Sequence, residues 1–183
     1  MGNPDFAVRP LQVMLEQHYN IVAVVTGQDK PAGRGKKLCE SAVKQFAQQH
    51  NLPILQPESI KSEDFIEKLR QYNVDLIVVV AFKMLPKVVW QIPKIGTINI
   101  HASLLPQYRG AAPINWAIIN GEKKTGVTSF LINEVIDTGN ILLQKEVEIT
   151  DEETAETLHD KLQESGSQLL LETLKVLEDG SVK

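Results

Sequence analysis

The chain alternates short, nearly continuous apolar runs with longer segments in which apolar residues recur at helical spacing. The apolar runs predict buried strands at residues 20–26, 53–55, 74–81 and 97–100. The segments between them predict helices, which begin near Asp5, Ser41 and Ser62. This succession of strands and helices predicts the α/β class, with a doubly wound, mostly parallel sheet and helices on both faces.

The pattern changes in the second half of the chain. Residues 125–132 and 141–149 predict two strands joined by a polar loop, which pair as a hairpin-like edge of the sheet. Two amphipathic helices, at 152–164 and 167–177, are expected after them. All of these elements fit a single domain over residues 1–183.

Two polar segments lie between the predicted elements. The opening residues Gly2-Asn3-Pro4-Asp5 are typical of the turn that follows a strand, so we expect the strand that feeds this turn to be missing from the chain. Residues 27–37 contain three glycines and a proline and predict a long polar loop. Because it follows a strand, this loop is expected on the same rim of the sheet as the end of the strand at 97–100.

Composition narrows the class of protein. Of the 183 residues, 43% are hydrophobic and none lie in a run long enough to span a membrane, which predicts a globular, soluble protein. The single cysteine, Cys39, excludes an internal disulfide and a cysteine-rich metal site. With no signal peptide recognisable, these features predict a cytoplasmic location.

Charge is unevenly distributed along the chain. The net charge of −4 argues against a dedicated nucleic-acid binder. Residues 28–44, however, carry five cations against two anions, whereas residues 146–183 carry eleven acids against three lysines. Glycines interleaved with cations suit a loop that contacts phosphate, although a solvated surface explains such a charge run equally well.

Asn99 and His101 are the strongest candidates for chemistry. Strand side chains alternate between faces, so these two residues point the same way while Ile98 and Ile100 point to the other face. They also lie at the carboxyl end of a strand, where ligands bind in open α/β sheets. The alternative is a structural histidine that hydrogen-bonds a backbone carbonyl beside a structural asparagine.

Several common kinds of active site have no counterpart in the sequence. It contains no nucleophile elbow, no phosphate-binding Gly-Lys-Ser loop and no metal-ligand spacing. An amide, an imidazole and the carboxylate of Asp137 suit the attack of an amine on a carbonyl carbon. The amide donates to the oxygen that becomes anionic, and the imidazole accepts the proton of the amine.

The spaced motifs resemble those of the formyltransferases that use 10-formyltetrahydrofolate: Asn99-x-His101, Ser103-Leu104-Leu105-Pro106, Tyr108-Arg109-Gly110 and Asp137-Thr138-Gly139. The resemblance includes residues 2–8 and 31–37 and is closest to members that act on methionyl initiator tRNA. It implies a Rossmann-like fold and transfer of a formyl group to the methionine α-amino group in translation initiation. It also implies a carboxyl-terminal barrel domain, which the chain is expected to lack.

The resemblance implies roles for individual residues. Asn99 would hold the formyl oxygen, His101 would manage the amine proton, and Asp137 would position His101 and help the folate nitrogen leave. The folate contacts would come from Phe82, Met84, Leu85, Ser103, Leu104, Leu105, Pro106 and Ile136. The tRNA contacts would come from Arg34, Lys36 and Lys37. The co-substrate is 10-formyltetrahydrofolate, no metal is implied, and a monomer is expected.

Other functions remain open at this point. The loop after the strand at 74–81 departs from the family's common form: it is one residue shorter and reads Phe82-Lys83-Met84 in place of a Gly-Gln pair. A sugar-nucleotide or glycinamide-ribonucleotide formyltransferase, or a 10-formyltetrahydrofolate hydrolase, would use the same three groups. A non-catalytic nucleotide-binding module is a further alternative. Nothing in the chemistry of the sugar-nucleotide or glycinamide-ribonucleotide enzymes needs a basic, glycine-rich loop, so the segment 31–37 favours a tRNA substrate over these two.

Overall fold

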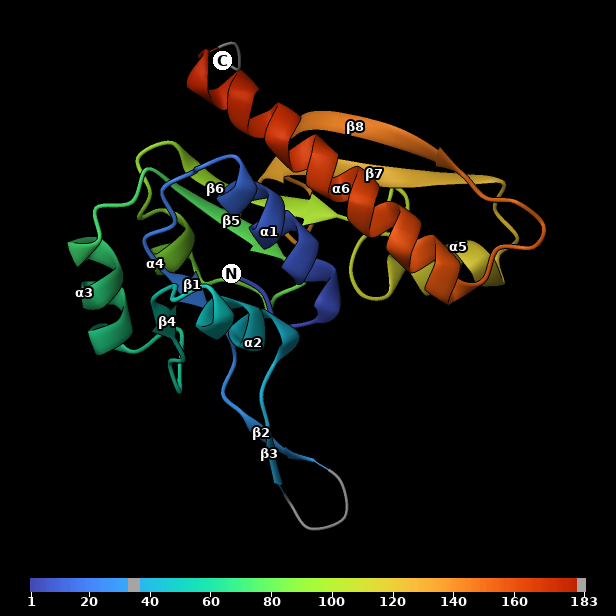
Figure 1. Ribbon diagram of the computed structural model, residues 1–183. Helices are drawn as coiled ribbons and strands as arrows, with labels where there is room; N and C mark the ends of the chain where they lie inside the picture. Colours follow the sequence, from blue (N-terminus) through green and yellow to red (C-terminus); the bar gives the residue numbers. More distant parts are fainter. Residues whose placement is uncertain (33–36, 181–183) are drawn as a thin grey trace.

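The computed structural model describes residues 1–32 and 37–180 and has the predicted α/β architecture (Figure 1). Its largest sheet has the order β5-β6-β7-β8. These strands are β5 (Leu76–Val80), β6 (Gly96–His101), β7 (Lys124–Leu131) and β8 (Ile141–Glu148). β5 and β6 are parallel, whereas β6, β7 and β8 pair antiparallel, so the hairpin-like edge predicted from the sequence is confirmed.

A second parallel pair lies beside this sheet, formed by β1 (Val24–Val25) and β4 (Ile54–Leu55). Met1 and Gly2 connect this strand pair to the four-stranded sheet. The Met1 amino group donates to the Val78 carbonyl at 2.6 Å, and the Val80 amide donates to the Met1 carbonyl at 3.0 Å. On the other side, the Gly2 amide donates to the Val25 carbonyl at 3.1 Å.

The strand predicted at 20–26 is much shorter in the structure. Only Val24 and Val25 have strand geometry, because β4 offers them a partner of just two residues. On the opposite side, residues 21–24 face β5 across a cavity of about 520 Å³ instead of pairing with a neighbour, and Val25 pairs only with Gly2. An extended segment without a partner makes no ladder hydrogen bonds, which explains the difference.

Helices cover both faces of the sheet, as predicted. One face carries α1 (Val8–Glu16), α2 (Ala42–Gln49), α5 (Pro113–Ile119) and α6 (Ala155–Glu178), and α1 follows the short 3₁₀ helix η1 (Asp5–Ala7). The other face carries α3 (Glu63–Gln71) and α4 (Lys87–Trp90). Ile98 and Ile100 of β6 pack in the first core, whereas Ile77 and Val79 of β5 pack in the second. No helix in the described part of the chain has the length and hydropathy needed to cross a bilayer.

The last helix corrects the prediction of two helices at 152–164 and 167–177. α6 is a single helix of 24 residues that crosses the sheet, with Gly166 near its middle (Figure 1). A Cβ at Gly166 would lie 3.2 Å from Cγ2 of Ile100, so the glycine serves close packing of the helix on β6. In the sequence alone, the same glycine resembles a helix break.

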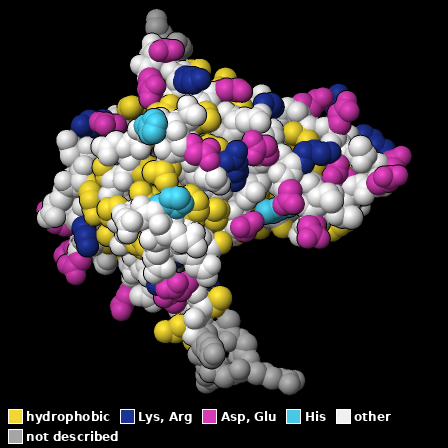
Figure 2. Space-filling model, viewed as in Figure 1, with side chains coloured by type: hydrophobic (Ala, Val, Ile, Leu, Met, Phe, Trp, Pro, Cys, Tyr) yellow, Lys and Arg dark blue, Asp and Glu magenta, His cyan; other side chains and the backbone are white. Residues whose placement is uncertain are grey.

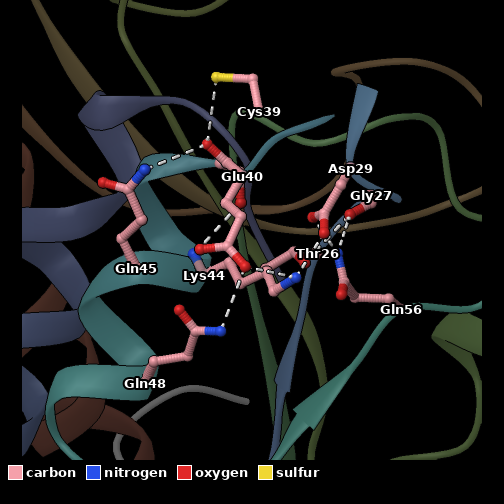
Figure 3. Close-up of polar contacts among 10 residues, drawn as sticks. Thr26, Gly27, Asp29, Cys39, Glu40, Lys44, Gln45, Gln48 and Gln56 are labelled. Carbon is pink, nitrogen blue, oxygen red and sulfur yellow. Dashed lines mark hydrogen bonds and ion pairs between the residues drawn. The ribbon is translucent and has the colours of Figure 1, made fainter. Parts of the chain in front are cut away.

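The predicted polar loop at 27–37 is also corrected. Residues on both sides of its centre form an antiparallel hairpin of β2 (Lys30–Ala32) and β3 (Lys37–Cys39), which projects from the body of the molecule (Figure 1). Lys44 of α2 closes the base of this arm by ion pairs with Asp29 at 2.5 Å and Glu40 at 2.9 Å (Figure 3). The hydrogen bond with Asp29 raises the pKa of the Lys44 ammonium.

Candidate active site

A cavity of about 600 Å³ opens at the carboxyl ends of β5 and β6. The structure brings together there all three groups that the sequence singled out for chemistry, Asn99, His101 and Asp137. Four of the predicted folate contacts line the same cavity: Phe82, Met84, Leu85 and Ile136. Residues from three separate segments of the chain therefore surround one space.

His101 is the last residue of β6, and 7% of it is exposed. Its Nε2 atom lies 2.9 Å from the backbone carbonyl of Tyr108. A carbonyl oxygen only accepts hydrogen bonds, so Nε2 carries a proton and, in the neutral ring, Nδ1 carries the lone pair. Nδ1 faces Oδ2 of Asp137 at 3.9 Å, which is longer than a direct hydrogen bond.

Asp137 is held by the loop that follows β6. The backbone amide of Gly110 donates to Oδ2 of Asp137 at 2.8 Å, and Nε of Arg109 donates to the Asp137 carbonyl at 3.0 Å. Asp137 itself has a φ of 50°, in the left-handed region, which is uncommon for a residue other than glycine. These contacts fix the carboxylate in front of the imidazole.

Asn99 lies two residues before His101, opposite Val79 of β5 and Phe130 of β7. Its Oδ1 atom is buried and has no hydrogen-bond partner in the described part of the chain. Leaving a buried acceptor unpaired costs about 1–3 kcal/mol, and such atoms call for an explanation. Because Oδ1 is buried, the group that Asn99 can offer to a ligand in the cavity is the Nδ2 donor of its amide.

The apolar residues around the opening are strongly exposed. Met84 is 71% exposed and Ile136 is 55% exposed, and Val135 beside it is 63% exposed. Phe82 and Leu85 also line the cavity, after the end of β5, but Leu85 is only 7% exposed. Large exposed apolar side chains at the mouth of a cavity are suited to cover a flat ring.

The other four predicted folate contacts, Ser103, Leu104, Leu105 and Pro106, do not line this cavity. Ser103 is fully buried, and its hydroxyl donates to the Gln107 carbonyl at 2.6 Å. The Leu105 amide donates to the Thr128 hydroxyl at 3.1 Å. These contacts pack the turn against β7 and bring Tyr108 to His101. Because the four residues do not line the cavity, their contact with folate stays a prediction.

The structure adds groups that the sequence did not indicate. His159 of α6 lines the cavity, with its ring edge-on to that of Phe6 at a centroid distance of 5.3 Å. The helical pattern placed His159 among acidic residues, and only the packing of α6 brings it to the cavity. The Tyr108 carbonyl and the Gly110 amide are backbone groups, so their roles in the site cannot be inferred from the type of residue.

Two of the predicted tRNA contacts, Arg34 and Lys36, lie outside the described residues. Lys37 is the first residue of β3. At the base of the arm, Gln56 donates to the Gly27 carbonyl at 2.8 Å and to Asp29 at 2.9 Å (Figure 3). The described part of the arm is thus attached to the body through Asp29 and Lys44.

The sequence profile described as "Formyl transferase" matches residues 2–174, which is most of the chain. The chain belongs to this family. Two similar relatives, from Bacteroides fragilis and Flavobacterium johnsoniae, are both named methionyl-tRNA formyltransferase. Each is 55% identical over all of this chain, which spans 56% and 58% of their respective lengths.

Solved structures of other formyltransferases share the fold. The phosphoribosylglycinamide formyltransferase of Anaplasma phagocytophilum superposes with a TM-score of 0.81 at 22% identity, over 100% of this chain and 85% of that one. WlaRD, a sugar 3N-formyl transferase, superposes with a TM-score of 0.72 at 26% identity, over 100% of this chain and 62% of that one. The Rossmann-like fold expected for this formyltransferase is therefore confirmed.

Proposed function

We propose that this chain is the catalytic domain of an enzyme that transfers a formyl group from 10-formyltetrahydrofolate to the α-amino group of methionyl initiator tRNA. The observation that carries the proposal is the meeting of Asn99, His101 and Asp137 around one cavity. The names of the relatives that are 55% identical over the whole chain support the choice of substrate.

The three groups suit a single displacement without a covalent enzyme intermediate. The α-amine nitrogen attacks the formyl carbon, and the Asn99 amide donates to the oxygen that becomes anionic. Nδ1 of His101, which carries the lone pair, accepts the proton that the amine loses. The bond from the formyl carbon to the folate nitrogen then breaks, and that nitrogen takes up a proton with the help of Asp137.

The cavity also suits the co-substrate. The pterin ring is flat and largely apolar on its faces. Met84 and Ile136 offer exposed apolar side chains at the opening, and Phe82 and Leu85 also line the cavity. The sugar 3N-formyl transferase WlaRD was crystallised in the presence of 5-N-formyl-THF, and its fold superposes on this chain. The reaction as written needs no metal ion.

The initiator tRNA is the proposed partner. Arg34 and Lys36, which lie between β2 and β3 in the sequence, and Lys37, the first residue of β3, would contact the phosphates of the acceptor stem. We also propose a strand before Met1, which the cavity between β1 and β5 has room for, and a carboxyl-terminal barrel domain. The proposed enzyme is monomeric and works in the cytoplasm, where initiator tRNA is formylated.

The alternatives differ in the molecule that accepts the formyl group. A glycinamide-ribonucleotide or sugar-nucleotide formyltransferase uses a small amine, and a hydrolase uses water. Neither acceptor needs an arm that projects beyond the body of the enzyme (Figure 1). Offering the full-length protein each acceptor with 10-formyltetrahydrofolate separates them, and a faster reaction with water or a small amine contradicts the proposed substrate.

The role of His101 is tested by its replacement with alanine in the full-length protein. We expect His101→Ala to lower kcat for formyl transfer about 100-fold or more, because a positioned acid–base group contributes about that much. His50→Ala is the matched control, since His50 lies at the end of α2 against Phe46. Equal rates for the two variants would contradict the role given to His101.

A further inference from the structure

The imidazole of His101 is held by the backbone carbonyl of Tyr108. The family resemblance instead implied that Asp137 positions this ring. Nε2 of His101 is 2.9 Å from the Tyr108 carbonyl, a hydrogen-bond distance. The Asp137 carboxylate, at 3.9 Å from Nδ1, is too far for a direct hydrogen bond. Within the described residues, the orientation and the tautomer of the ring are therefore set by a backbone carbonyl.

That carbonyl is aimed by an unusual backbone conformation. Tyr108 has a φ of 54°, and a left-handed conformation costs a residue with a Cβ atom about 1–2 kcal/mol. A residue keeps such a conformation only when its surroundings hold it there. The side chain of Tyr108 must therefore be anchored.

The phenol supplies the anchor. The Tyr108 hydroxyl hydrogen-bonds the carboxylate of Glu122, and Nδ2 of Asn120 donates to the same hydroxyl at 2.9 Å. Both partners come from the segment between α5 and β7, and neither lines the cavity. The hydrogen bond with Glu122 raises the pKa of the Tyr108 phenol.

The next two residues, Arg109 and Gly110, hold Asp137, the other group proposed to assist a proton transfer. The Gly110 amide binds the Asp137 carboxylate, and the Arg109 guanidinium binds the Asp137 carbonyl. Three consecutive residues thus fix both the imidazole and the carboxylate. A shift of this turn would move the two groups together.

We propose that Tyr108 is a positioning residue, which keeps His101 as the Nε2–H tautomer and leaves Nδ1 free as the base. The expected effect on kcat rests on the proposed formyl transfer. The tautomer of His101 can be measured without any substrate. With the proton on Nδ1 instead, the ring would have no lone pair facing the cavity, and the attacking amine could not pass its proton to it.

The test combines ring ¹⁵N chemical shifts of His101, which distinguish the two tautomers, with steady-state kinetics of the full-length protein. We expect only the Nε2–H tautomer in the unchanged protein and a mixture in Tyr108→Phe, which loses the phenol anchor. We also expect Tyr108→Phe to lower kcat about tenfold, less than complete loss of an acid–base group, with KM for 10-formyltetrahydrofolate within about twofold. Glu122→Ala should reproduce both effects.

Conservative and distant variants separate positioning from general loss of structure. Glu122→Gln keeps an acceptor for the phenol and should restore most of the tautomer preference and of kcat. Tyr19→Phe is the matched control, because burial and the nearby Glu178 raise the pKa of the Tyr19 phenol, but Tyr19 lies away from the active site. It should leave the tautomer and kcat unchanged.

Two results would overturn the inference: an Nδ1–H tautomer in the unchanged protein, or a Tyr108→Phe variant that keeps both the tautomer and kcat. Its failure is distinguishable from failure of the proposed function. If the unchanged protein transfers no formyl group but the tautomer responds to Tyr108→Phe as expected, the positioning role stands and the substrate is wrong.

Discussion

At the scale of single residues, Asn99 gives a prediction that separates function from stability. Asn99→Leu should lower kcat about 100- to 1,000-fold, as expected for loss of an oxyanion donor. The free energy of unfolding should stay the same or rise by about 1 kcal/mol, because the variant removes a buried Oδ1 that has no partner among the described residues. Thermal unfolding and steady-state kinetics measure the two effects. A variant that unfolds several degrees lower while keeping its activity would show that Asn99 is structural.

The positions of Asn99 and His101 could be predicted from the sequence, because the two-residue repeat of a strand gives them a common face. Asp137 was indicated by its motif, and all three residues line the cavity. The Tyr108 carbonyl and the Gly110 amide could not be predicted, because every residue has such groups and only the path of the loop selects these two.

Elements differ in how well the pattern predicted them. The strands ending at Val80 and His101 were found because each is apolar and has partners in the sheet. The strand at 20–26 was overestimated because pairing, which depends on the neighbours, decides how much of an apolar run becomes a strand. The glycine in α6 was misinterpreted because close packing and helix termination both favour glycine.

Gly166 provides the test at this scale. Gly166→Val should lower the free energy of unfolding by about 1–3 kcal/mol, because the new side chain would push α6 away from Ile100 of β6. For a domain of this size, each kcal/mol lost corresponds to a fall of about 2–4 °C in Tm. Gln168→Val, at an exposed position of the same helix, is the control for the β-branched side chain. Equal Tm values for the two variants would show that the glycine is not needed for packing.

At the scale of the whole molecule, the sheet is interrupted between β1 and β5. Only Met1 and Gly2 bridge the two strands, and the rest of the gap is the cavity of about 520 Å³. Figure 2 shows hydrophobic side chains gathered on this face of the molecule, between α1 and α3.

The central claim is that Asn99 and His101 act on one formyl carbon. A crystal structure of the full-length protein with a stable folate analogue that carries a formyl group on N10 tests it most directly. We predict the formyl oxygen within about 3.5 Å of Asn99 Nδ2, with Nδ1 of His101 facing the side from which an amine would attack. A formyl group bound outside the cavity at the end of β6, or turned away from both side chains, would contradict the account.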